Sequence, residues 1–136
     1  MKTNHLTSYR SNKHVKFSCK YHIIFCPKYR RKVLIDGVET RLSNIIEEVS
    51  EELNCILLEY EVMPDHVHLL VDVDPTFGVK SFISKLKGRS ARILRDEFPV
   101  LRSKLPCLWT SSYFVSTVGG ASLETVKQYI EDQKNV

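Results

Sequence analysis

Alternating apolar and polar residues predict four strands along the chain. Between residues 15 and 26 the apolar positions recur at every second residue, which is typical of a strand buried on one face, and Pro27 ends the run. Residues 55–62 and 66–73 show strand patterns on either side of a short turn, so together they predict a hairpin. Residues 109–118 predict the fourth strand.

A longer period predicts three helices. Apolar residues recur at helical spacing over residues 37–54 and again over residues 79–98. Residues 99–106 are expected to form a loop, and a last helix is expected to begin after Ser122, whose side chain can cap its first turn. The predicted order is β-α-β-β-α-β followed by one helix. That is the order of a ferredoxin-like α+β fold, with an antiparallel sheet and both long helices on one face.

Length and composition are those of one soluble domain. The chain has 136 residues, of which 43% are hydrophobic and 26% are charged. We expect residues 15–136 to form the domain and residues 1–14 to form a flexible arm. No apolar run reaches the roughly 20 residues that cross a bilayer, and the N-terminus lacks the apolar segment of a secretory signal.

The cysteines indicate the cellular compartment, and the net charge indicates the kind of partner. None of the four cysteines forms a C-x-x-C pair, so we expect small buried side chains in a reducing cytoplasm rather than a zinc ribbon. The net charge of +4 is compatible with a polyanionic partner and does not require one.

Two histidines two residues apart are the first candidate for chemistry. Side chains alternate along a strand, so His66 and His68 point away from the core that Val67 and Leu69 enter. Their Cα atoms are expected about 6.6 Å apart, from two strand rises of about 3.3 Å, and two imidazoles at that separation can converge on one divalent ion. The alternative is a pair of surface histidines with no ligand. A metal site requires at least one further ligand.

The last helix can supply that ligand and a nucleophile. Gln133 and Tyr129 are four residues apart and lie at the border of the apolar stripe of this helix. A helix packed on the open sheet face can bring the Gln133 oxygen beside the histidines and the Tyr129 hydroxyl one turn away. Glu59 and Glu61, on the neighbouring strand, are rival ligands. A tyrosine beside a metal can attack a phosphodiester, although packing alone also explains Tyr129.

Basic residues cluster in two places. One cluster lies in the connector after the first strand, and the other lies on the second predicted helix. Both clusters are suited to contact with phosphates. A solvent-exposed helix face explains the second cluster equally well. The candidate DNA-binding residues are Lys28, Arg30, Arg31, Lys85, Lys87, Arg89 and Arg92.

Five segments, in order, resemble one known family. They are "YHIIFCPKYRRKVL", "EVMPDHVHLLV", "LKGRSARIL", "LWTSSYFVSTVGGAS" and "QYIEDQ". Together they are similar to the single-tyrosine HUH transposases of bacterial and archaeal insertion sequences, the IS200-like transposases. The resemblance runs from about Tyr21 to Gln133, and every motif position matches.

The resemblance implies a site and a reaction. His66 and His68 would be the histidines of the HUH motif, Gln133 the third ligand of Mg²⁺ or Mn²⁺, and Tyr129 the nucleophile that forms a 5′-phosphotyrosine intermediate. The substrate would be single-stranded DNA with imperfect hairpins near the ends of the element. Members are homodimers in which the tyrosine helix of one subunit can complete the other's site. Gly119 and Gly120 would then be the hinge of that helix.

Three rival functions remain open at this level. A domesticated relative that nicks hairpin repeats, or a rolling-circle initiator, would use the same chemistry, although an initiator would usually carry further domains. A nucleic-acid-binding module without catalysis would stack bases on exposed sheet aromatics; the third strand shows His66 and His68 there instead. A histidine-triad hydrolase would have a further histidine where Leu70 stands.

Overall fold

A four-stranded antiparallel sheet forms the centre of the molecule. The computed structural model describes residues 9–118, 123–134 and 136. The strand order is β4-β5-β3-β6, and all three neighbouring pairs are antiparallel. The bounds are Lys20–Phe25 for β3, Ile56–Met63 for β4, His66–Asp72 for β5 and Phe114–Thr117 for β6.

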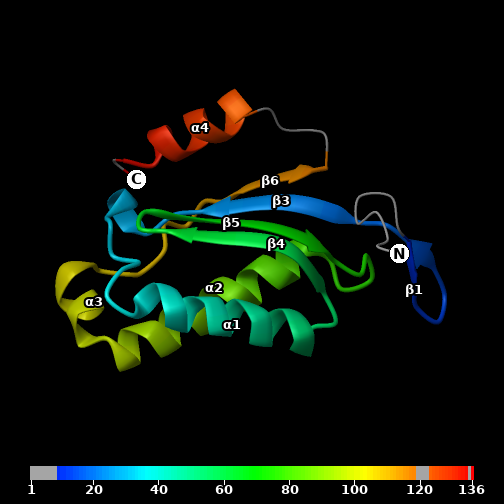
Figure 1. The fold of residues 1–136 in the computed structure, drawn as a ribbon, viewed down its shortest axis with the longest axis horizontal. Coiled ribbons are helices and arrows are strands. Elements are labelled where there is room, and N and C mark those ends of the chain that lie inside the picture. Colours follow the sequence, from blue (N-terminus) through cyan, green and yellow to red (C-terminus); the bar gives the residue numbers. More distant parts are fainter. Residues whose placement is uncertain (1–8, 119–122, 135) are drawn as a thin grey trace.

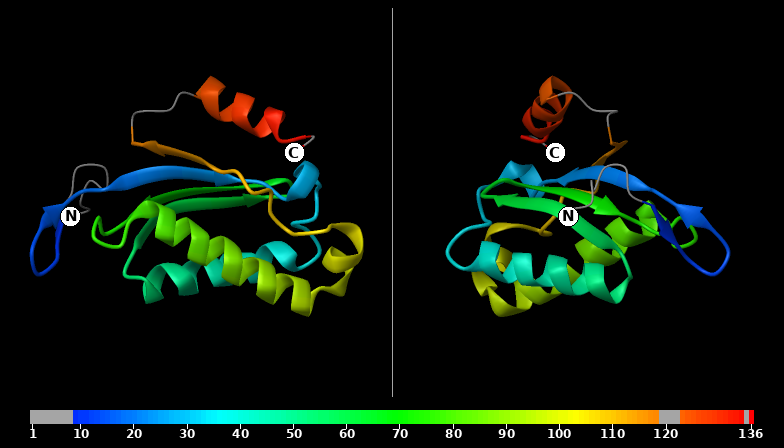
Figure 2. Two further views of the ribbon diagram at one scale, coloured as in Figure 1. Left: turned by 180° about the vertical axis from the view of Figure 1, so that it is seen from behind. Right: turned by 45° about the vertical axis from the view of Figure 1, so that its right-hand side comes forward.

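Helices cover both faces of this sheet. The long helices α1 (Val38–Glu52) and α2 (Val79–Glu97) lie together on one face, and α4 (Leu123–Asp132) lies on the other (Figure 1). The view from behind and the view turned by 45° in Figure 2 show the same three layers. The predicted ferredoxin-like α+β class is therefore confirmed, including the separate placement of the last helix.

The main core lies between the sheet and the two long helices. Val67, Leu69 and Val71 of β5 are fully buried there, as the alternation of β5 predicts. They meet the apolar stripes of α1 and α2, which include Leu42 and Phe82. Consequently the odd-numbered positions of β5 are fixed in the core, and its even-numbered positions, which begin with the two histidines, occupy the face beneath α4.

Three predicted elements are corrected by the structure. The expected strand over residues 15–26 is divided into β2 (Lys16–Phe17) and β3, and the expected strand over residues 109–118 is reduced to β6. The expected loop after α2 contains a short helix, α3 (Pro99–Lys104). Proline is favourable at the first helical position because its missing N–H has no partner to lose there. Ser122, Gly119 and Gly120 lie outside the described residues.

The N-terminal hairpin is tied to the end of the sheet. β1 (Arg10–Ser11) pairs with β2, and the Arg10 guanidinium donates to the carbonyl oxygens of Asn54 and Asp72. It also forms an ion pair with the Asp72 carboxylate at 3.3 Å. The predicted arm, residues 1–14, thus contains a paired strand near its end; its first eight residues lie outside the described part of the chain. No helix in the described ranges is long and apolar enough to span a membrane.

Candidate functional site

The two histidines of β5 lie on the sheet face that α4 covers. In the sheet register His68 stands opposite Ile24 of β3 and Glu61 of β4, and His66 stands opposite Met63. Both histidine side chains are partly exposed. The open-face position predicted for the pair is therefore what the structure shows.

His66 is oriented by the residue before it. Its Nδ1 lies 2.8 Å from Oδ1 of Asp65. A carboxylate can only accept a hydrogen bond, so Nδ1 carries the proton and the lone pair lies on Nε2. An imidazole held in this way by a carboxylate has the tautomer and orientation of a metal ligand.

His68 is paired with a histidine that sequence reasoning left outside the site. His22 Nδ1 lies 3.1 Å from His68 Nε2, and the two rings stack with centroids 5.3 Å apart. Burial, followed by the neighbouring His22, lowers the pKa of His68 below its ordinary value. His68 is therefore neutral near pH 7, which is the form that can bind a metal.

Tyr129 and Gln133 meet at Ser112, just before β6. The Tyr129 ring packs against Phe114, with centroids 5.5 Å apart, and its hydroxyl lies 3.5 Å from Ser112 Oγ. The Ser112 hydroxyl donates to Gln133 Oε1 at 3.1 Å, and Gln133 Nε2 donates to the Tyr129 carbonyl at 3.2 Å. The predicted neighbourhood of Tyr129 and Gln133 is thus present, and a serine holds the pair together.

Burial makes Tyr129 a weak nucleophile by itself. It raises the pKa of the Tyr129 phenol, and the contact with the Ser112 hydroxyl only partly opposes that shift. The phenol is consequently protonated at neutral pH, so attack requires that its proton be taken up as the new bond forms.

The predicted metal ligands are brought to one face but not into one cluster. The hydrogen bonds of the Gln133 amide go to Ser112 and Tyr129, and among the described residues none goes to His66 or His68. Within those same ranges no three or more His, Cys, Asp and Glu side chains are grouped so as to hold a metal. The histidine pair fits a metal as two nitrogen donors. The remaining ligands would have to be oxygen atoms, from an amide, a carboxylate, a phosphate or water.

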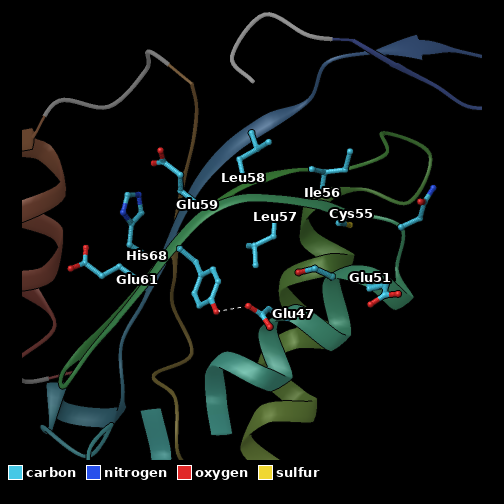
Figure 3. A pocket seen from close by; sticks show the side chains of 12 residues that line it. Glu47, Glu51, Cys55, Ile56, Leu57, Leu58, Glu59, Glu61 and His68 are labelled. Carbon is cyan, nitrogen blue, oxygen red and sulfur yellow. Dashed lines mark hydrogen bonds between the residues drawn. The ribbon is translucent and has the colours of Figure 1, made fainter. Parts of the chain in front are cut away.

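The rival acidic ligands line a separate hollow. A pocket of about 910 Å³ follows the free edge of β4 and reaches His68. In Figure 3, Glu59 and Glu61 lie with His68 on one side of β4, and Glu47 of α1 lies on the other. Glu47 accepts a hydrogen bond from Tyr60 at 2.7 Å. Glu61 is next to His68 in the register and remains an available oxygen ligand.

The predicted basic residues divide into two groups. The exposed group consists of Arg31, Lys85 and Arg92. The others have partners within the chain: Lys87 donates to the Thr110 and Ser112 carbonyls, Arg89 pairs with Glu52, Lys28 lies over the Tyr29 ring, and Arg30 pairs with Asp65 and Glu131. The α2 residues also lie on the opposite face of the sheet from α4 (Figure 1). The structure therefore does not gather these seven residues into one surface.

Comparison with known proteins identifies the family. The family model for transposases of the IS200-like type matches residues 15–133, nearly the whole chain. The chain belongs to the IS200-like transposase family. The resemblance drawn from its motifs is confirmed.

Several members of the IS200-like transposases are similar over most of their length. The ISDra2 transposase TnpA of Deinococcus radiodurans is 37% identical over 119 residues, which cover 86% of this chain and 85% of that protein. The transposase for insertion sequence element IS200 of Salmonella typhimurium is 35% identical over 126 residues, which cover 91% of this chain and 82% of the relative.

Solved structures agree with the fold. A crystal structure of a Deinococcus radiodurans R1 protein assigned as a transposase superposes with a TM-score of 0.81 at 36% identity, covering 93% of this chain and 99% of that one. A REP-associated tyrosine transposase bound to a REP hairpin superposes with a TM-score of 0.57 at 11% identity, covering 89% of this chain and 69% of that one. At that identity the second likeness concerns the fold alone.

Proposed function

We propose that this IS200-like transposase cleaves and rejoins single-stranded DNA at the ends of an insertion sequence through a covalent bond between Tyr129 and a DNA 5′-phosphate. The observation that carries the proposal is that α4 and β5 present Tyr129 and the His66–His68 pair on the same face of the sheet. Family membership supports the same reaction class.

The reaction is a transesterification. The Tyr129 oxygen attacks a backbone phosphorus, the bond from phosphorus to the 3′ oxygen breaks, and the leaving oxygen gains a proton as the phenol loses its own. The phosphotyrosine keeps the energy of the broken ester, so another 3′-hydroxyl can attack it and rejoin the strand. No ATP is needed.

The chain's own side chains would prepare this step. His66 and His68 would hold Mg²⁺ or Mn²⁺, and the bound ion would polarise the phosphodiester. Gln133 can become a third ligand if its amide turns away from Ser112. Phe114 holds the Tyr129 ring on the sheet face, and Asp65 fixes the ring of His66.

The substrate and assembly follow from the same proposal. We infer that the chain binds a hairpin in single-stranded DNA near the element's ends, as one distant structural neighbour is bound to a REP hairpin. The exposed Arg31, Lys85 and Arg92 are the most accessible of the proposed phosphate contacts. A homodimer in the cytoplasm, with Gly119 and Gly120 as the hinge of α4, would place two tyrosines at the two ends of one element.

A nicking assay with strand-specific labels tests this function. Hairpin oligonucleotides from the element's ends, labelled at either the 5′ or the 3′ end, are incubated with the protein and Mg²⁺ or EDTA. We expect a protein–DNA adduct on the 3′-labelled fragment alone, absent with EDTA and absent for Tyr129→Phe. Tyr29→Phe is the matched control, because Tyr29 is an exposed phenol in the connector after β3. Hairpin binding without an adduct under either metal would identify a binding module instead.

A further inference from the structure

Arg30 is engaged inside the protein rather than free on its surface. Its Nε lies 3.4 Å from Oδ2 of Asp65, and its Nη1 lies 3.1 Å from Oε2 of Glu131. Nη1 also lies 3.4 Å from the carbonyl oxygen of Ile130. Only 18% of the Arg30 side chain is exposed. These contacts engage two of the three guanidinium nitrogens, Nε and Nη1, with groups of the protein.

An unusual backbone aims this side chain. Tyr29 and Arg30 have φ values of +59° and +50°, a region that residues other than glycine rarely adopt. Such conformations persist where the surroundings fix them. Here the Tyr29 N–H donates to the Val136 carbonyl at 2.9 Å, and the Lys28 N–H donates to the Leu108 carbonyl at 2.8 Å. The connector after β3 is thus held in a turn that directs Arg30 between β5 and α4.

Asp65 transmits the Arg30 contact to the histidine pair. One oxygen of its carboxylate accepts the hydrogen bond from His66, and the other pairs with Arg30. A carboxylate held at both oxygens cannot rotate freely, so the His66 ring that it holds is restrained too. Partners of this kind, one step removed from a metal, typically change its affinity by about 10- to 100-fold.

Glu131 connects Arg30 to the tyrosine helix. It lies two residues after Tyr129 on α4, and its Oε2 accepts a hydrogen bond from Arg30 Nη1 at 3.1 Å. Arg30 therefore touches the element that carries the nucleophile and, through Asp65, the element that carries the histidines. The guanidinium can do this because its planar set of donors serves two carboxylates at once, which a lysine ammonium on a flexible stem does less well.

We propose that Arg30 is a positioning residue that couples the docking of α4 to the orientation of His66, and that it is not a phosphate contact. The proposal rests on the proposed function, in which His66 holds a metal and Tyr129 is the nucleophile. It assigns to Arg30 a role different from the DNA binding that its place in a basic connector predicts.

The neighbouring arginine supplies a matched control. Arg31 is exposed and has the same charge, so Arg31→Gln lowers the net charge equally without touching Asp65 or Glu131. The comparison set is wild type, Arg30→Gln, Arg30→Lys and Arg31→Gln. Thermal unfolding of each variant confirms folding, and Arg30→Lys carries the comparison if Arg30→Gln does not fold.

Three measurements separate positioning from DNA contact. Electron paramagnetic resonance measures Mn²⁺ binding to the DNA-free protein. Hydrogen–deuterium exchange mass spectrometry measures the exchange of the α4 amides. Fluorescence anisotropy at several salt concentrations measures hairpin affinity. For Arg30→Gln we expect Mn²⁺ affinity to fall at least about tenfold and α4 exchange to rise. We expect the hairpin affinity of Arg30→Gln to stay near that of wild type, whereas Arg31→Gln, which removes a proposed phosphate contact, should weaken the hairpin complex. Arg30→Lys should recover neither Mn²⁺ affinity nor α4 protection fully.

The opposite results would overturn the proposal. Unchanged Mn²⁺ affinity and α4 exchange, with a weaker hairpin complex and a smaller salt dependence, would make Arg30 a phosphate contact. A change in only one of the first two measurements would refute the coupling. If the wild type binds Mn²⁺ but forms no DNA adduct, only the proposed function is contradicted. The Mn²⁺ affinities and α4 exchange of the Arg30 and Arg31 variants could still be compared. A wild type that binds no Mn²⁺ would overturn both proposals.

Discussion

Replacing Ser112 by alanine should strengthen metal binding while slowing the chemistry. In the structure the Ser112 hydroxyl donates to Gln133 Oε1 at 3.1 Å, and this is the oxygen that would have to face a metal. Metal binding therefore competes with this hydrogen bond. The Gln133 side chain is buried, with 6% of the residue exposed, so its oxygen gains from a new partner once the serine is gone.

The size of the effect follows from the bond that is removed. A neutral hydrogen bond contributes about 0.5–1.5 kcal/mol net, and Ser112 itself is exposed, which favours the lower half of that range. A loss of about 0.5–1 kcal/mol corresponds to a rise in Mn²⁺ affinity of about 2- to 5-fold. Once Gln133 has turned to the metal, the Ser112 hydroxyl is free to donate to the Tyr129 oxygen, and that hydrogen bond lowers the pKa of the phenol. Ser112→Ala removes it, so the phenol becomes harder to deprotonate and adduct formation at saturating metal should slow.

Two quantities from one titration, the half-saturating metal concentration and the maximal rate, separate these effects. Adduct formation is measured as a function of Mn²⁺ concentration for wild type, Ser112→Ala and Ser116→Ala, the control. Ser116 lies in β6, and its hydroxyl donates to the Thr117 carbonyl instead of Gln133. We expect a lower half-saturating Mn²⁺ concentration and a lower maximal rate for Ser112→Ala alone. A raised half-saturating concentration would refute the reasoning, because Gln133 would then need Ser112 in order to bind.

Further predictions concern the stability of the fold, its dependence on pH, and the carboxylate that orients His66. Asp72→Ala should lower the free energy of unfolding by about 3–5 kcal/mol, because it breaks ion pairs at a residue that is only 2% exposed. Urea unfolding measures this loss, with Asp96→Ala as the control at an exposed site. A loss below about 1 kcal/mol would contradict the prediction. The folded-state pKa of His68 is lowered by burial. The unfolded chain therefore takes up this proton more readily, and stability should fall as pH decreases through about 6.5 toward the folded-state pKa. Unfolding midpoints from pH 8 to pH 5 should show a smaller decline for His68→Gln, and parallel curves would refute this. Asp65→Asn should weaken Mn²⁺ binding by about 10- to 100-fold through His66, as isothermal titration would show; unchanged affinity would mean that His66 needs no partner.

Much of the sheet and half of the site could be predicted from local periodicity. The two-residue repeat of β5 determines that His66 and His68 leave the core, because a shift by one residue would bury both. The four-residue spacing of Tyr129 and Gln133 puts them together at the end of α4, with Gln133 one residue beyond Asp132, without any tertiary information. These arrangements depend on neighbours within one element.

The remaining contacts depend on how elements pair. His22 meets His68 because of the β3–β5 register, in which it stands opposite Leu70. Ser112 reaches Gln133 only after α4 has packed on the sheet. Arg30 is directed inward by two left-handed residues, and a sequence without glycine at those positions gives no signal for them. Sequence reasoning could have noticed Asp65 beside His66, but it cannot say that the carboxylate turns back to the ring.

The most direct measurement of the central claim is the mass of the peptide that carries the DNA. After reaction with a hairpin oligonucleotide and Mg²⁺, nuclease and trypsin digestion should release residues 128–134, QYIEDQK, which contains a single tyrosine. We predict that this peptide gains a nucleotide joined through its 5′-phosphate to Tyr129. A nucleotide on any other peptide, or cleaved DNA without a modified peptide, would contradict the account.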